Sequence, residues 1–174
     1  MAQASTQSLI AALEAGRQQV ISAVGGLSDD AAATRPAADR WSVLECLEHI
    51  AAVEHRFLSF AGTGDTYDAP RIDPARERDL AERVVDRTTR REAPEAMVPT
   101  GRFRSVPEAL AAFHEARDTS VRFVSDHGDR LYTIKAAHPR FGELNGVELL
   151  YLVNGHALRH VAQIQETRDA VARL

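Results

Sequence analysis

Residues 149–164 read LLYLVNGHALRHVAQI and are the most informative part of this 174-residue chain. Apolar residues recur here every three or four positions, as in a helix with one buried face. Two histidines lie on that face, where a helix buries its side chains. We predict a long helix that begins near Asn145–Gly146 and runs almost to the C-terminus. The stripe on its buried face consists of Leu149, Val153, His156, His160 and Ile164.

Three other segments have the same helical period. One of them opens at Ser42, a favourable N-cap, with Glu45 at the capping-box position. Another opens in the same way near Ser105. No segment shows a sustained apolar/polar alternation, so we predict no sheet. The predicted helices span about 6–24, 42–60, 105–127 and 145 to nearly the C-terminus.

These four helices predict the fold class, an all-α four-helix bundle that forms a single domain over residues 1–174. A long connection joins the second helix to the third. Its middle, Asp73 to Arg91, is dense in Arg, Asp and Glu. Such a mixture of both signs is typical of a solvated surface, so we predict a solvated helix or loop that covers one end of the domain.

Composition excludes several classes of function. Lys and Arg number 21 against 25 Asp and Glu, a net charge of -4, whereas nucleic-acid binding relies on a basic excess. The single cysteine, Cys46, excludes an internal disulfide framework and an all-cysteine zinc site. The N-terminal stretch lacks the pattern of a secretory signal, and no stretch approaches the roughly 20 apolar residues of a membrane span. We expect a cytoplasmic protein that binds neither nucleic acid nor membrane.

The two histidines of the last helix, His156 and His160, lie one turn apart, roughly 6 Å along the axis, so both rings can point at one ion. Buried imidazoles without partners are costly, and either a shared metal or hydrogen bonds within the core would explain them. His49 lies beside the core face of the second helix, although spacing alone does not show that it faces the pair. Three imidazoles on two helices would leave positions open for water or substrate, as a catalytic zinc, nickel or iron site requires.

Three segments resemble the DinB superfamily and occur in the order that the family has. WSVLECLEHI at 41–50 is similar to its second-helix signature. NGHALRHVAQI at 154–164 is similar to its fourth-helix signature, in which two histidines four residues apart precede Gln-Ile. HPRFGELNG at 138–146 is similar to the segment that leads into that helix. The similarity runs from Trp41 onward and is weakest at 62–104.

The resemblance implies a four-helix bundle with a divalent metal ion on His49, His156 and His160. The family includes proteins resembling the metal-dependent hydrolase YfiT and bacillithiol or mycothiol S-transferases, and many members are dimers. The resemblance therefore points to a homodimer with a small-molecule substrate, for which a low-molecular-weight thiol is one option. It leaves the metal open among zinc, nickel and iron.

Several polar residues lie next to His49 in the sequence. Cys46 could be a fourth ligand or a reactive thiol, but a buried packing role is favoured. Glu45 could orient the imidazole or only cap the helix. Glu48 and Glu54 are predicted to be solvated surface charges.

Other residues near the predicted site have open roles. Gln163 could hydrogen-bond a metal-bound water or face a partner chain, and Arg159 is predicted at the surface. His138 could lie over the bundle mouth, where a substrate would enter, although an ordinary loop histidine is favoured. Trp41 is predicted to pack before the helix N-cap. The histidines predicted to be structural or exposed are His55, His114 and His127.

Two hypotheses of different classes remain. The first is a metal-dependent enzyme in which the ion lowers the pKa of a bound water or thiol, giving a hydrolase or a thiol S-transferase. The second is a non-catalytic protein, metal-containing or metal-free, that binds a small ligand or serves in a stress response; no obvious general base accompanies the three histidines. An interaction-only helical scaffold ranks last, because it would leave two core histidines unexplained.

Overall fold

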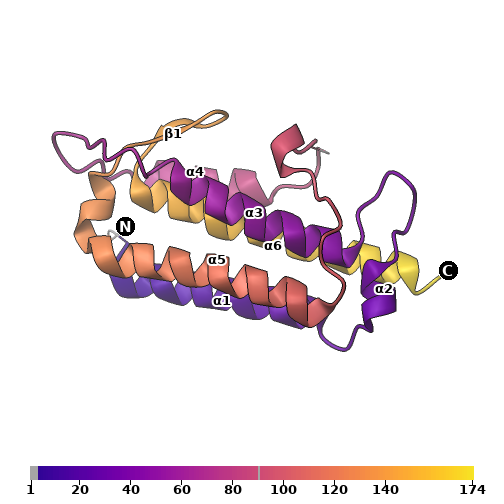
Figure 1. The fold of residues 1–174 in the computed structure, drawn as a ribbon. Coiled ribbons are helices and arrows are strands. Elements are labelled where there is room, and N and C mark those ends of the chain that lie inside the picture. Colours follow the sequence, from indigo (N-terminus) through magenta and orange to yellow (C-terminus); the bar gives the residue numbers. More distant parts are fainter. Residues whose placement is uncertain (1–3, 90) are drawn as a thin grey trace.

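Four long helices run side by side in the computed structural model, which describes residues 4–89 and 91–174 (Figure 1). They confirm the predicted bundle and agree closely with the predicted bounds. Among the described residues, no helix combines the length and the apolar character that crossing a membrane would require. The long helices are α1 (Thr6–Val24), α3 (Val43–Ser59), α5 (Val106–His127) and α6 (Gly146–Val171). The shorter elements are α2 (Asp29–Ala33), α4 (Pro74–Val85), the 3-10 helices η1 (Glu95–Met97) and η2 (Gly128–Tyr132), and the strands β1 (Ala136–His138) and β2 (Gly142–Leu144).

Side chains at the predicted starts cap α3 and α6. The hydroxyl of Ser42 accepts a hydrogen bond from the amide of Glu45, and the carboxylate of Glu45 accepts one from the amide of Ser42. Asn145 and Glu148 form the same reciprocal pair at the start of α6. These bonds satisfy amides that the first turn of a helix leaves unpaired. Local sequence therefore fixes where these two helices begin.

The order of the helices around the bundle explains the long connection. α1 packs against α5 and α6, and α3 packs against the same two helices, so α1 and α3 lie at opposite corners. Figure 1 shows that the neighbours α3 and α5 run in the same direction. Two parallel neighbours need a crossover connection that returns along the bundle. The segment that contains α4 and η1 makes this return.

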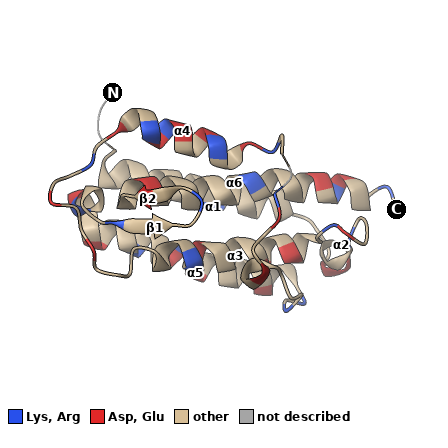
Figure 2. Ribbon diagram, turned by 90° about the horizontal axis from the view of Figure 1, so that it is seen from above, with Lys and Arg blue, Asp and Glu red and all other residues tan. Residues whose placement is uncertain are grey.

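The prediction that the charged connection covers one end of the domain is wrong. The connection forms a helix that lies along α6 (Figure 2). This helix, α4, carries charged residues of both signs. Its Leu80 and Val84 belong to one buried cluster with Leu149 and Leu152 of α6. The two helices approach closely at Gly155, where a Cβ atom would lie 2.1 Å from the Cγ1 of Val84. A small residue on α6 therefore permits this packing.

A short hairpin corrects the prediction that the chain has no sheet. β1 and β2 pair antiparallel, with Ala136 opposite Leu144 and His138 opposite Gly142. Gly142 has a φ of 70°, a left-handed conformation that glycine adopts without strain. Each strand has only 3 residues, too few for an alternating pattern to be recognised. The hairpin lies over the side of the bundle that α3 and α6 form (Figure 1, Figure 2).

An ion pair lies in the interior of the bundle and corrects the prediction for Glu54. This residue is 2% exposed, and its carboxylate accepts a hydrogen bond of 3.0 Å from the buried guanidinium of Arg117. Ser120 donates a second bond of 2.6 Å to the same carboxylate. Arg117 also donates to the Leu13 carbonyl and to the side-chain oxygen of Asn154. Because both partners of Glu54 lie on α5, no pattern within α3 reveals them.

Candidate metal centre

Three histidines from two helices meet inside the bundle. His49 of α3 faces His156 and His160 of α6, with ring centroids 5.0 and 4.7 Å away, and the two α6 rings are 4.6 Å apart. One nitrogen from each ring lies within 4.8 Å of the nitrogens from the other two. Helical spacing indicated the α6 pair, and the packing of α3 on α6 adds the third ring. We call these residues the three-His group.

Hydrogen bonds orient two of the rings. The Nδ1 of His49 lies 2.7 Å from the Met97 carbonyl oxygen, and the Nδ1 of His160 lies 2.9 Å from the side-chain oxygen of Gln163. Both partners are acceptors, so each Nδ1 carries the proton and each Nε2 keeps its lone pair. Gln163 thus holds a histidine ring, a role different from the two that the sequence suggested. Met97 is a site residue that sequence reasoning missed, because any residue type can offer a carbonyl.

Burial keeps the three rings neutral. It lowers the pKa of His49, brings that of His160 to about 3, and sets that of His156 well below its ordinary value. A charge on one ring would also oppose a charge on the next, which lowers the pKa values of the α6 pair further. Neutral imidazole is the form that binds a metal ion. The group is therefore in the ligand form at neutral pH.

The donor set fits a divalent ion. Among the described residues, the contacts of His156 are ring contacts with His49, His160 and Phe57, and none is a hydrogen bond. A partly buried imidazole without a hydrogen-bond partner is unfavourable unless a ligand satisfies it. Three neutral imidazoles suit zinc, nickel or iron and leave coordination positions open.

Aromatic side chains enclose the three-His group. The ring of Trp41 lies 4.8 Å from that of His49 and 6.2 Å from that of His160. The ring of Phe57 lies 5.7 Å from that of His156. Trp41 has the packing role that the sequence predicts, and its packing partners are the predicted ligands.

His138 is buried, not on an open loop. It ends strand β1 and is 7% exposed, with its ring 5.0 Å from Phe57 and 5.0 Å from Phe141. Its Nδ1 accepts hydrogen bonds from the amides of Arg140 and Phe141, so the proton is on Nε2. Phe57 lies against both His138 and His156. His138 is thus near the three-His group without belonging to it. His55, His114 and His127 do not belong to the group either.

Sequence comparison agrees with this geometry. A sequence model of the DinB superfamily matches residues 12–164, which is most of the chain. The chain belongs to the DinB superfamily. Among curated proteins, the uncharacterized protein YuaE of Bacillus subtilis (strain 168) is 26% identical over 148 residues, which are 85% of this chain and 90% of YuaE.

Two solved structures share the fold of this DinB-superfamily chain. YfiT from Bacillus subtilis, described as a probable metal-dependent hydrolase with an unusual four-helix bundle topology, gives a TM-score of 0.58 at 19% identity, covering 93% of this chain and 85% of YfiT. The four-helix bundle protein TT2238 gives a TM-score of 0.57 at 20% identity, covering 93% of this chain and 99% of TT2238. At these identities the likeness shows the four-helix bundle architecture alone.

Glu48, predicted as a surface charge, is buried in this DinB-superfamily protein. It is 5% exposed, and its carboxylate accepts hydrogen bonds from the three amides of residues 100–102. These bonds fix the segment that presents the Met97 carbonyl to His49. The partners lie about 50 residues away in the chain, so the sequence around Glu48 contains no sign of them.

Arg159 is also buried where the sequence predicts exposure. It is 8% exposed, and its guanidinium donates to the carbonyls of Asp86 and Thr89. These two carbonyls belong to the segment that follows α4. Arg159 therefore ties α6 to this segment, next to the metal centre.

Cys46 and Glu45 have structural roles. Cys46 is fully buried in the main core cluster, and burial raises the pKa of its thiol to about 12. It lies outside the three-His group, in agreement with the favoured packing role. The Glu45 carboxylate caps α3 and pairs with Arg35. Of its two suggested roles, the structure shows the cap, and the Nδ1 of His49 is bonded to Met97 instead.

Proposed function

We propose that the protein is a metal-dependent enzyme that holds one divalent ion in the three-His group and catalyses a hydrolysis. The observation that carries this proposal is the meeting of His49, His156 and His160 as neutral rings. The fold shared with YfiT, itself described as a probable metal-dependent hydrolase, supports it. When bound, such an ion lowers the pKa of a coordinated water or thiol toward neutrality and so supplies the nucleophile.

The residues around the group orient the ligands and exclude solvent. The Met97 carbonyl and Gln163 fix the tautomers of their two histidines, so that the Nε2 atoms remain available. Trp41 and Phe57 cover the rings with apolar surface. In such surroundings electrostatic interactions are stronger than in water.

Transfer of a small thiol onto an electrophile is the second reaction that this site supports. A thiol becomes a nucleophile once its own pKa falls, without a protein base. Within the described residues, no carboxylate joins the three-His group. A hydrolase would turn over esters or amides without added thiol, whereas a transferase would consume a chlorinated aromatic only when a thiol is present.

The proposal also includes a small-molecule substrate, a homodimer and a cytoplasmic location, as the family resemblance and the composition suggest. Light scattering of the purified protein measures its mass directly. A mass of about twice 19.1 kDa is the expected result.

The deciding experiment measures metal content by mass spectrometry on protein purified without an affinity-tag metal. We expect about one divalent ion per chain in the wild type and almost none in His156→Ala. His55→Ala, an exposed histidine on α3, is the matched control and should keep the ion. No ion after reconstitution at neutral pH would contradict the proposal, and a non-catalytic ligand-binding protein would then explain the fold better.

A further inference from the structure

Three arginines from separate parts of the chain come together beside the three-His group. Arg91 follows α4, Arg140 lies at the tip of the hairpin, and Arg159 lies on α6. The guanidinium of Arg159 donates hydrogen bonds to the carbonyls of Asp86 and Thr89, in the segment that leads from α4 to Arg91. Burial lowers the pKa of Arg91, the charge of Arg140 lowers it further, and the charge of Asp86 raises it. We call these three residues the arginine group.

Ring contacts show how the hairpin tip meets the end of α4. The guanidinium carbons of Arg83 and Arg140 lie 5.8 and 5.7 Å from the centre of the Phe141 ring. Arg91 donates a hydrogen bond of 3.3 Å to the carbonyl of Arg83. Arg83 therefore connects the two: its backbone carbonyl accepts from Arg91, and its guanidinium shares the Phe141 ring with Arg140.

The arginine group has an excess of positive charge. The exposed carboxylate of Asp86 acts on Arg91 and Arg159 and opposes the lowering of their pKa values, but it forms an ion pair with neither, so three guanidinium groups share one counter-charge. The ion pairs among the described residues include none of its three members. The guanidinium N–H groups of Arg159 donate to backbone carbonyls. The buried Nε of Arg91 has no hydrogen-bond partner among the described residues. The neighbouring Arg87, by contrast, pairs with Glu166 at 2.6 Å.

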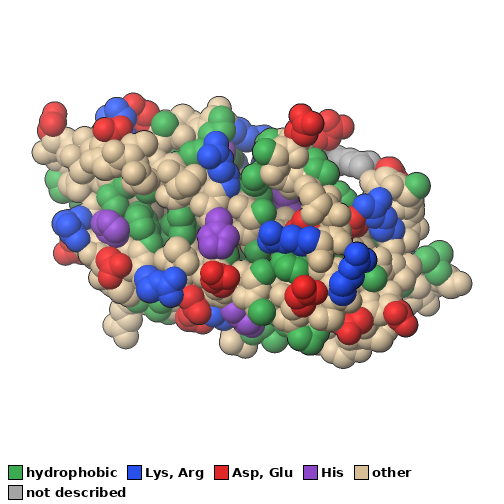
Figure 3. Space-filling view, in the orientation of Figure 1, with side chains coloured by type: hydrophobic (Ala, Val, Ile, Leu, Met, Phe, Trp, Pro, Cys, Tyr) green, Lys and Arg blue, Asp and Glu red, His purple; other side chains and the backbone are tan. Residues whose placement is uncertain are grey.

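The arginine group lies close to the histidines. Arg159 directly precedes His160 on α6, and the backbone amide of Arg140 donates to the Nδ1 of His138. The charge of Arg140 reaches the His138 ring, whose pKa it lowers in addition to the larger effect of burial. In Figure 3 the surface is hollowed between the hairpin and the segment with η1, and basic and histidine side chains are visible at the hollow.

We propose that the arginine group binds an anionic group, a carboxylate or a phosphate, of the molecule on which the three-His group acts. The catalytic part of this statement rests on the proposed function; the binding part does not. Three cations that share one carboxylate, two of them partly withdrawn from water, are unfavourable together, and a bound anion relieves them. Guanidinium groups match carboxylate and phosphate oxygens in geometry. A divalent ion nearby would add to the positive potential.

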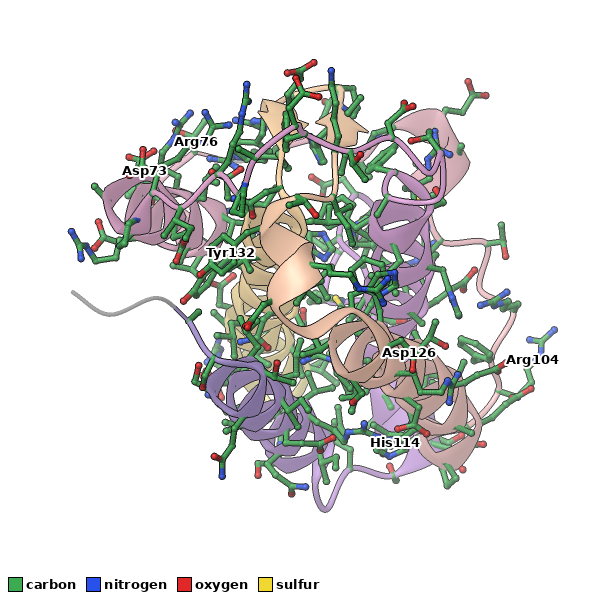
Figure 4. All side chains as sticks on the ribbon, turned by 90° about the vertical axis from the view of Figure 1, so that its left-hand side faces the viewer. Asp73, Arg76, Arg104, His114, Asp126 and Tyr132 are labelled. Atoms are coloured by element: carbon green, nitrogen blue, oxygen red, sulfur yellow. The ribbon has the colours of Figure 1, made fainter. Side chains whose placement is uncertain are left out.

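The test measures anion binding by calorimetry on metal-free protein at low ionic strength, with inorganic phosphate and with succinate as probes. At least one probe should bind, and its affinity should fall about tenfold in Arg140→Gln and in Arg91→Gln, because each removes a charge-assisted contact. Arg104→Gln is the matched control, because Figure 4 shows Arg104 extending away from the bundle. This variant should bind the anion with the affinity of the wild type. Preference for phosphate would indicate a phosphorylated compound, and preference for succinate a carboxylic acid.

Two results would overturn the proposal. One is the absence of binding of either probe to the wild type, and the other is equal affinity in the wild type and in Arg140→Gln, whose side chain is exposed and whose loss should leave the fold intact. Metal content is measured separately. If the protein binds the anion but no metal, this result contradicts the proposed function and still supports the anion-binding site.

Discussion

The Nδ1 of His49 lies 2.7 Å from the carbonyl oxygen of Met97, which is 48 residues further along the chain. This bond links the second long helix to the end of the return segment. Because the carbonyl fixes the proton on Nδ1, the Nε2 of His49 keeps the lone pair that a metal ion would bind. The position of one candidate ligand thus depends on a loop whose own anchor is Glu48.

Replacing Glu48 by alanine should weaken metal binding and reduce stability. The change leaves the amides of residues 100–102 without their acceptor and releases the segment that carries Met97. We expect metal affinity to fall about tenfold or more and the free energy of unfolding to fall by about 2–3 kcal/mol. Competition with a metal chelator and urea denaturation measure the two effects. Glu82→Ala, an exposed position on α4, should change neither.

Gln163 offers a test that is confined to one ligand. Gln163→Leu removes the acceptor of His160 Nδ1–H and should weaken metal binding roughly 10- to 100-fold, because the ring loses its fixed tautomer and orientation. Gln165→Leu, at an exposed position two residues away, is the control. Equal metal affinities in the two variants would show that Gln163 does not position the ligand.

The sequence predicted those parts of the fold and site that depend on local order. Helical period and capping residues lie within one segment, so they located the four long helices and the pair formed by His156 and His160. The contact of His49 with this pair depends on how two helices pack, and only the family resemblance placed it. The sequence cannot show such a contact by spacing.

The wrong predictions have a common physical cause. Glu48, Glu54 and Arg159 are charged residues whose partners lie on distant segments, between 52 and 73 residues away for the bonds that bury them. A charged side chain without a local partner is usually exposed, so exposure was the reasonable expectation for each. The hairpin and the position of α4 along α6 were missed for the same reason, because both are set by contacts between distant segments.

Trp41 provides an optical probe of the site. It is the single tryptophan of the chain, and its ring lies 4.8 Å from that of His49. Binding of a paramagnetic ion such as nickel to the three-His group should quench its fluorescence, since quenching by direct contact requires this kind of proximity. We expect saturation at about one ion per chain, and loss of the quenching in His156→Ala. A wild-type signal that does not respond to nickel would place the ion elsewhere.

The contact of Gly155 with Val84 predicts a clash that a second substitution relieves. Gly155→Ala should improve helix propensity by about 1 kcal/mol, yet the added methyl group has no room beside the Val84 side chain. We expect a net loss of about 1–3 kcal/mol in the free energy of unfolding. In the background of Val84→Ala the same substitution should be much less harmful. Additive losses in the double variant would show that the two residues are not in contact.

His138 should make the stability of the metal-free protein depend on pH. Burial, aided by the charge of Arg140, lowers the pKa of this residue from 6.5 to about 4. Between pH 6.5 and 4 the unfolded chain therefore binds a proton at this residue more readily than the folded chain does. The contribution of His138 to the free energy of unfolding is fully present above about pH 6.5 and is lost as the pH falls toward 4. The contribution to the slope is at most about 1.4 kcal/mol per pH unit. His138→Asn offers an oxygen near the place of Nδ1 and does not titrate, so its free energy of unfolding should fall less steeply over this interval in urea denaturation. Parallel curves for the variant and the wild type would mean that His138 is not held neutral by the fold.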